Sequence, residues 1–223
     1  MQRKFLFEEG EIYHLYNRGV NKQSIFLDDH DRFRLLILLY CCNGTKEVRL
    51  GNHKSLSLGE YFLIDRGEPL VEILAYCLMP NHFHFLVKEI TEGGISLFMQ
   101  KALTGYGMYY NTKHSRTGPL FEGRFKAQHV DDDEYLEYVL AYIHLNPVKI
   151  KDEESWSGKK IADPVLAEKF LDRYRFSSYL NFLGKSRVED PILNLSDIPE
   201  DIISEQKNVS ELIKIWSAEI LED

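Results

Sequence analysis

The sequence predicts an α+β fold in which a mainly antiparallel sheet carries helices on one face. Two observations lead to this prediction. Short stretches with alternating apolar and polar residues, typical of strands, come between longer stretches with helical periodicity. The expected order of elements is strand, helix, strand, strand, helix, strand and then a further helix. This order favours one sheet with helical crossovers over separate all-α and all-β parts.

Four strands are expected, each bounded by residues that turn the chain. The first alternates in polarity and ends at Gly19, and the last follows a loop that contains Gly118-Pro119. The two central strands are separated by Pro80-Asn81. The expected strands cover residues 11–20, 72–79, 82–89 and 124–130.

Five helices are expected. Acidic residues within 28–31 and 131–134 supply N-caps and favourable charge to the helices that follow. Gly93-Gly94 precedes a long amphipathic helix, and Pro147 is expected to end the fourth helix. The expected helices cover residues 32–42, 95–112, 131–146, 164–183 and 209–220. The first six elements match the split β-α-β topology of ferredoxin-like folds.

The length of 223 residues suits one domain with an appendage. We expect a catalytic or binding domain over residues 1–150 and a helical extension over 151–223. A polar, glycine-containing stretch at about 43–70 is expected to be an insertion with one short element of its own, around 59–65.

Composition predicts a cytoplasmic protein. No apolar run approaches the length of a membrane span, and the N-terminus lacks the apolar core of a secretory signal. Cys41, Cys42 and Cys77 show no Cys-x-x-Cys spacing and cannot all pair within one chain, so reduced thiols are expected.

The net charge of −8 argues at first against a nucleic-acid partner, but most of the excess acid lies in residues 151–223. Between residues 98 and 130 the only acid is Glu122, and aromatic residues alternate with cations. Cations for phosphates and rings for base stacking suit single-stranded DNA; the alternative is a solvated helix with a half-buried aromatic face. The cations of this stretch are Lys101, Lys113, Arg116, Arg124 and Lys126.

Two pairs of polar residues suggest a catalytic site. His82 and His84 lie two apart on an expected strand and therefore share a face, and imidazole is a common metal ligand. Tyr142 and Asn146 lie four apart on an expected helix and also share a face. Two histidines and an amide oxygen would leave metal positions open for a phosphate, and the tyrosine could attack it. The pattern predicts a metal-assisted DNA nuclease with a tyrosine nucleophile.

Each residue has a structural alternative. The histidines could form a polar strand face, Tyr142 could be a core aromatic, and Asn146 could be only a C-terminal cap before a proline. Tyr138 is a rival nucleophile, although no amide follows it at the fourth position.

Two further histidines are assigned lesser roles. His144 lies away from the Tyr142 face of the helix and is expected at the surface or against nucleic acid. His14 is expected either to pack or to support the site from the first strand.

Several segments together resemble the REP-associated (RAYT-like) branch of the one-tyrosine HUH transposases. They follow the family's order and span residues 11 to 149. Another segment, Tyr174 to Tyr179, also resembles the family, although Phe176 stands where Trp is more usual. The carrying segments are YHLYNRG at 13–19, AYCLMPNHFHFLV at 75–87, LFEGRFK at 120–126 and YIHLNPVK at 142–149.

The resemblance implies an enzyme with a ferredoxin-like HUH domain that cleaves single-stranded, hairpin-containing DNA. Cleavage with Mg²⁺ or Mn²⁺ would leave a 5′-phosphotyrosine and a free 3′-hydroxyl. Tyr142 would be the nucleophile, and the metal ligands would be His82, His84 and Asn146. DNA contacts are expected from Arg18, Arg124, Lys126, Lys101 and Arg116.

Alternatives remain open at this point. The runner-up is a non-catalytic regulator that binds DNA or RNA hairpins, and a weaker one is a Zn²⁺ hydrolase, which lacks a third ligand at a zinc-like spacing. The protein is expected near the nucleoid, as a monomer or a homodimer, with no membrane partner.

Overall fold

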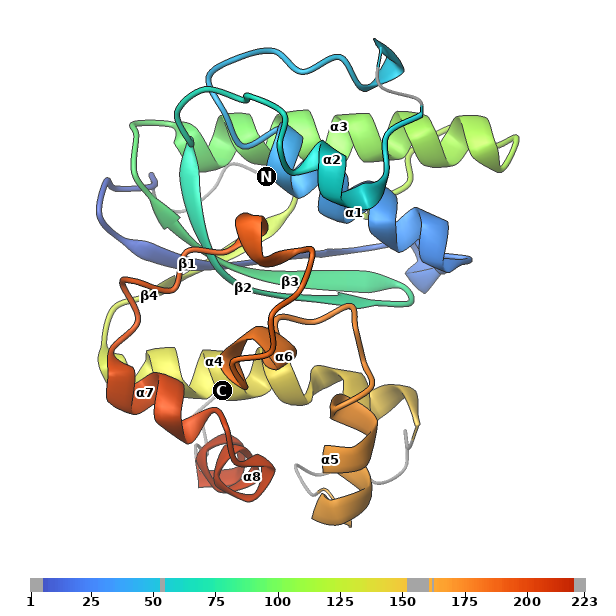
Figure 1. Cartoon of the computed structure of the whole chain (residues 1–223). Coiled ribbons are helices and arrows are strands. Elements are labelled where there is room, and N and C mark those ends of the chain that lie inside the picture. The colour runs from blue at the N-terminus through green and yellow to red at the C-terminus, as the bar shows by residue number, and fades with distance from the viewer. Residues whose placement is uncertain (1–5, 53–54, 152–160, 162, 219–223) are drawn as a thin grey trace.

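The computed structural model describes residues 6–52, 55–151, 161 and 163–218. A four-stranded antiparallel sheet, in the order β2-β3-β1-β4, lies between two layers of helices (Figure 1). This is the strand order of a split β-α-β sheet, so the predicted ferredoxin-like α+β class is confirmed, although helices cover both faces and not only the one expected. The strands are β1 (Ile12–Arg18), β2 (Val71–Met79), β3 (His82–Glu89) and β4 (Lys126–Val130).

The first face of the sheet is covered by the two crossover helices of the split β-α-β motif, α1 (Asp29–Cys41) and α3 (Gly94–Lys113). Strand residues that alternate along β1 and β3 point into this layer and build the main core, among them Leu15, Phe83 and Phe85. Full burial of each such side chain stabilises the fold by about 1.5–3 kcal/mol.

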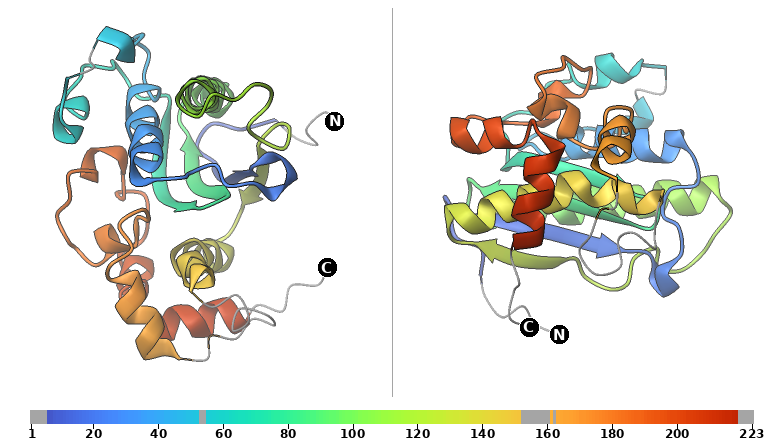
Figure 2. Two further views of the ribbon diagram at one scale, coloured as in Figure 1. Left: turned by 90° about the vertical axis from the view of Figure 1, so that its right-hand side faces the viewer. Right: turned by 90° about the horizontal axis from the view of Figure 1, so that it is seen from below.

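The second face is covered by α4 (Asp133–Leu145), which lies along the sheet with α8 (Val209–Ala218) packed against it (Figure 2). Leu86 and Val130 of the sheet meet Leu140 of α4 in a second core. Because β2 is covered on both faces, its side chains are nearly all buried, which accounts for its continuous apolar sequence.

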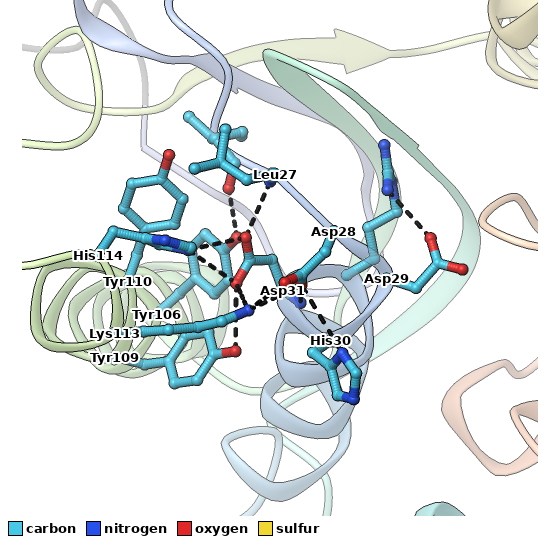
Figure 3. A network of polar contacts seen from close by, with 12 residues as sticks. Leu27, Asp28, Asp29, His30, Asp31, Tyr106, Tyr109, Tyr110, Lys113 and His114 are labelled. Atoms are coloured by element: carbon cyan, nitrogen blue, oxygen red, sulfur yellow. Dashed lines mark hydrogen bonds and ion pairs between the residues drawn. The ribbon is translucent and has the colours of Figure 1, made fainter.

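Asp31 joins α1 to α3 through a buried polar network (Figure 3). Its carboxylate accepts hydrogen bonds from the Leu27 amide at 2.8 Å, from Lys113 Nζ at 2.8 Å and from Tyr109 Oη at 3.2 Å. Burial alone would raise the pKa of Asp31, but the bonds from Lys113, Leu27 and His114 outweigh it, and the pKa lies below its ordinary value.

Aspartates cap both helices that were expected to have acidic N-termini. The Asp28 carboxylate accepts from the Asp31 amide at 2.9 Å, and the Asp132 carboxylate accepts from the Tyr135 amide at 2.6 Å. Each cap contributes about 1 kcal/mol.

The single helix predicted over 164–183 is wrong. The chain forms α5 (Pro164–Leu171), passes through turns, and then forms the short α6 (Tyr179–Phe182). Residues 176–178 lie beside the outer edge of β2: the Leu78 amide donates to the Phe176 carbonyl at 2.9 Å, and the Ser178 amide donates to the Tyr76 carbonyl at 2.9 Å. The unpaired edge of β2 needs these partners, and this need overrides the helical pattern of the sequence.

Other boundaries moved by a few residues. Strand β4 begins two residues later than expected. Helix α4 ends at Leu145, before Pro147 as predicted, and the chain continues in a 3-10 turn that begins at Asn146. The insertion contains two short helical elements. The remaining elements are η1 (Val20–Lys22), η2 (Leu50–Asn52), α2 (Leu58–Tyr61), η3 (Asn146–Ile150), η4 (Asp190–Ile192) and α7 (Glu200–Glu205).

The C-terminal region packs on α4 in the parts that the structure describes. Residues 152–160, 162 and 219–223 of the predicted extension, including the end of the helix expected over 209–220, lie outside the described residues. The three cysteines are free thiols, as expected. None of the described helices has the length and apolar character needed to cross a membrane.

Candidate active site

A cleft of about 730 Å³ opens where β1 ends and β3 begins, on the α4 side of the sheet. Its lining includes His82 and His84 from β3 together with Tyr142 from α4. The fold therefore brings together two pairs of residues that are about 60 positions apart in the sequence. We describe these side chains first and then the charges around them.

The register of β1 and β3 places the two histidines. His82 lies opposite Arg18, and His84 lies opposite Tyr16. Both histidines share the face that α4 covers, and their ring centroids are 5.0 Å apart. The predicted side-by-side placement of the two imidazoles is confirmed.

His84 is buried and held by a third histidine. His14 Nε2 and His84 Nδ1 are 2.9 Å apart, so one of these nitrogens donates a proton to the other. Nε2 of His84 is also buried, and no described residue gives it a hydrogen-bond partner. Burial lowers the pKa of His14 to about 4 and that of His84 well below its ordinary value, so both rings are neutral.

His82 is held by its neighbour in the sequence. Its Nδ1 lies 2.6 Å from Oδ1 of Asn81. Burial lowers the pKa of His82 to about 4, and the charge of Lys149 acts in the same direction, whereas the nearby Asn146 amide opposes the shift. The two histidines are therefore neutral imidazoles, the form that binds metals.

Tyr142 stands edge-on against the histidines. Its ring centroid is 5.2 Å from that of His84 with an interplanar angle of 88°, and its other face neighbours Tyr138 at 6.4 Å. Burial raises the pKa of the Tyr142 phenol, although the Asn146 amide opposes this. At neutral pH the phenol is protonated and needs activation before it can act as a nucleophile.

Asn146 is fully buried one turn after Tyr142. Its backbone amide donates to the Tyr142 carbonyl and closes the last turn of α4, as the capping alternative predicted. Its side chain is not used for this: neither Oδ1 nor Nδ2 makes a regular hydrogen bond to any described residue. An unpaired buried amide costs about 1–3 kcal/mol, which a bound ligand would recover.

These donors suit a divalent cation that accepts nitrogen and oxygen ligands. His84 Nε2 and Asn146 Oδ1 are buried polar atoms that make no regular hydrogen bond to any described residue, and His82 lies beside both. Among the described residues, no group of three His, Cys, Asp or Glu side chains is arranged to hold a metal. A site here would need the amide oxygen as its third protein ligand, which gives two nitrogen donors and one oxygen donor.

The cleft is rich in positive charge. Arg18, Lys22, Lys126 and Lys149 all line it, and its one acidic lining residue, Glu122, forms an ion pair with Arg18. Burial lowers the pKa of Lys149 to about 8, and its Nζ lies 5.0 Å from the centroid of the Tyr142 ring. Such a surface attracts a polyanion.

The predicted DNA contacts divide into three groups. Arg18 and Lys126 line the cleft, and Arg124 lines a larger groove along α3 that shares Asn17 and Glu122 with it. The two remaining residues line neither cavity: Lys101 donates to the Gly44 carbonyl at 2.8 Å, and Arg116 stacks on Tyr110. The aromatic residues Tyr106 and Tyr110 are buried in the core rather than open to bases.

The sequence analysis did not identify Asn81, Lys22 or Lys149 as site residues. Asn81 directly precedes His82, and Lys149 lies one turn beyond Asn146, so their positions in the sequence offered a signal. The predicted position of His144 is wrong. That side chain is fully buried, with Nδ1 2.9 Å from Gln206 Oε1 and Nε2 3.0 Å from Ser178 Oγ, because the C-terminal region covers this side of α4.

Comparisons with known proteins agree with this geometry. The family model described as "Transposase IS200 like" matches residues 38–146, a range that contains both histidines of β3, Tyr142 and Asn146. A solved structure, that of a REP-associated tyrosine transposase bound to a REP hairpin, has the same fold with a TM-score of 0.51 and 12% sequence identity. The alignment covers 89% of this chain and 94% of the other. No curated protein matches the sequence.

Proposed function

We propose that this chain, which matches the model of the IS200-like transposases over residues 38–146, cleaves and rejoins single-stranded DNA through a 5′-phosphotyrosine. The observation that carries the proposal is the contact of Tyr142 with the buried His84, which stands beside His82 inside a cationic cleft. A hairpin-containing strand is the proposed substrate, in keeping with the hairpin bound to the protein of similar fold.

His82, His84 and Asn146 would hold the metal ion, through their imidazole nitrogens and the amide oxygen. When bound, Mg²⁺ or Mn²⁺ supplies polarisation of the scissile phosphate and neutralises the charge that develops on its oxygens. The chain's own contribution is to keep both imidazoles neutral and to hold them on one face of a rigid sheet.

Tyr142 carries out the covalent step. Its phenol oxygen forms a bond to phosphorus while the bond from phosphorus to the 3′ oxygen breaks. The phenol loses its proton, and the departing oxygen gains one to become a free 3′-hydroxyl. One phosphodiester replaces another, so a 3′-hydroxyl can reverse the step without ATP.

The cations of the cleft hold the strand during this exchange. Arg18, Lys22, Lys126 and Lys149 surround the tyrosine and contact successive phosphates of the bound strand. The ring of Tyr16, which Lys126 approaches to 5.9 Å, offers a surface on which a base can stack.

The test is a denaturing gel of the purified protein with single-stranded hairpins taken from the DNA that flanks its own gene, labelled at either end. With Mn²⁺, the fragment 3′ of the cut should shift onto the protein, and EDTA should abolish the shift. Tyr142→Phe should lose the adduct and keep DNA binding. Tyr138→Phe, one turn earlier on the same helix, is the matched control and should keep the adduct.

Two results would overturn the proposal. If Tyr142→Phe still forms the adduct and Tyr138→Phe does not, the nucleophile has been assigned wrongly. If the wild-type protein binds hairpins tightly but forms no adduct with any flanking sequence in Mg²⁺ or Mn²⁺, the protein is a hairpin-binding regulator that keeps the fold.

A further inference from the structure

We infer that Asn81 and His14 are positioning residues that set the tautomers of His82 and His84, so that each ring directs the lone pair of Nε2 toward the metal ion. The inference rests on the proposed function for its purpose, but the hydrogen bonds that carry it belong to the protein alone. Both act through the histidine that each contacts.

The tautomer of His82 follows from the partner of its Nδ1. Oδ1 of Asn81 can only accept a hydrogen bond, and it lies 2.6 Å away, so Nδ1 of His82 must carry the proton. In a neutral imidazole the other nitrogen, Nε2, then bears the lone pair. Nδ1 is thereby excluded as a ligand, and Nε2 is available.

The orientation of the Asn81 amide is fixed independently. Its Nδ2 donates to the Lys22 carbonyl at 3.2 Å, and because a carbonyl cannot donate, Oδ1 has to face His82. The Asn81 carbonyl also accepts from the Gly19 amide at 2.8 Å. A Cβ at Gly19 would lie 2.3 Å from the Gln23 carbonyl oxygen, so only glycine allows the loop to close on this turn.

The tautomer of His84 is set from the neighbouring strand. His14 is a diagonal neighbour of His84, because its direct partner in the register is Leu86. With Nδ1 of His84 as the donor and Nε2 of His14 as the acceptor, Nε2 of His84 bears a lone pair. This is the atom that is buried without a partner among the described residues.

The reverse arrangement fits the site poorly. If His14 donated to His84, the proton of His84 would move to Nε2, and the buried atom without a partner would be an N–H group, which folded proteins rarely tolerate. His14 is also not a third histidine ligand while its Nε2 is engaged by His84. Both metal-binding rings are thus held through Nδ1, one by an amide and one by an imidazole.

This arrangement predicts a specific sensitivity. When a residue that orients a metal-binding histidine by a hydrogen bond is removed, metal affinity typically falls by about 10- to 100-fold. Asn81→Leu and His14→Leu remove the acceptor at each position. Asn81→Asp and His14→Gln are the matched variants that keep a hydrogen-bond acceptor.

The experiment measures tautomers and metal affinity separately on the full chain. Long-range ¹H–¹⁵N NMR of the imidazoles without metal should show protons on Nδ1 of both His82 and His84. In Asn81→Leu only His82 should lose its preference for the proton on Nδ1, and in His14→Leu only His84 should lose it. Mn²⁺ affinity, followed by electron paramagnetic resonance, should fall about 10- to 100-fold in both Leu variants and recover in Asn81→Asp and His14→Gln.

The outcomes separate this inference from the proposed function. Protons on Nε2 in the wild-type protein, or unchanged Mn²⁺ affinity in folded Leu variants, would overturn the positioning roles even if the protein cleaves DNA. Direct ligation by His14 would appear as loss of Mn²⁺ binding in His14→Gln as well. Wild-type protein with both protons on Nδ1 but no Mn²⁺ binding would refute the metal-dependent mechanism instead, and with it the purpose assigned to these bonds.

Discussion

Lys149 shows how one residue can serve two parts of the site. It follows Asn146 by three positions on a 3-10 turn, lines the cleft and lies over the Tyr142 ring. Because burial lowers its pKa to about 8, it is mostly charged at neutral pH and loses that charge a little above it. The charge therefore lies close enough to interact electrostatically with both the Tyr142 phenol and a bound phosphate.

Removing this charge should weaken DNA binding. We expect Lys149→Met to lower hairpin affinity uniformly across sequences and to reduce the slope of log affinity against log salt by about 1. Lys149→Arg should keep the slope. Fluorescence anisotropy of a labelled hairpin in EDTA, at several salt concentrations, measures both quantities.

Lys214→Met is the control for charge alone, because this exposed lysine lies on α8 and pairs with Glu211. An equal loss of slope in Lys214→Met and Lys149→Met would show that overall charge, and not the cleft, governs binding.

At the scale of elements, α1 and α3 depend on one buried carboxylate. Asp31 is completely buried and receives bonds from Lys113 and His114 as well as from Tyr109 (Figure 3). A buried ion pair contributes modestly to stability, but its rupture leaves a charge without a partner. The two helices that cover the first face are thereby held in one relative position.

We expect Asp31→Asn to lower the free energy of unfolding by on the order of 3 kcal/mol at pH 7. The pKa of Asp31 is below its ordinary value in the folded state, so its contribution is complete above the ordinary aspartate range and is lost as pH falls toward the folded-state pKa. Urea unfolding at several pH values should therefore show a smaller difference between variant and wild type in acid.

Asp29→Asn is the matched control. This neighbour on α1 pairs with Arg32 at the surface, and such pairs contribute about 0–1 kcal/mol. If Asp31→Asn destabilises no more than Asp29→Asn, the network does not hold the helices together.

The open edge of β2 explains why the helix predicted over 164–183 did not form. Residues 164–183 have a helical pattern, yet 176–178 pair with the edge of β2, and the Ser178 hydroxyl accepts from the Tyr76 amide at 3.0 Å. The gain from satisfying a buried strand edge exceeds the small helical preference of a few residues. A single sequence does not reveal which strand will have an open edge.

At the scale of the whole molecule, one chain contains every side chain of the candidate site. Tyr142 contacts His84 and His14 of its own sheet, and α4 is held there by the second core and by α8. We therefore expect one chain to complete the site by itself, without exchange of the tyrosine helix between subunits.

A mixing experiment tests this arrangement. His82→Ala and Tyr142→Phe should each form no adduct, and their mixture should form none either, because no chain in it has both an intact metal pair and the tyrosine. The same gel assay measures the result, with the wild-type protein diluted by either variant as the reference. Recovery of adduct in the mixture would mean that the tyrosine acts on a partner chain.

The amino-acid sequence was sufficient to predict the features that depend on local spacing. A spacing of two residues on a strand predicted that His82 lies beside His84, and a spacing of four on a helix predicted that Tyr142 lies beside Asn146. The alternation of apolar residues predicted the order of elements. These features follow from the geometry of a single element. They therefore survive any error about how the elements pack.

How the pairs meet and what supports them depend on the tertiary structure. The register of β1 against β3 brought His14 to His84, the turn before β3 directed the Asn81 amide at His82, and the packing of α4 set Tyr142 against His84 and His14. The tertiary structure also buries His144 and places Lys101 and Arg116 outside the cleft. The physical reason is that these contacts join residues far apart in the chain, and their geometry follows from strand pairing and core packing that no local pattern encodes.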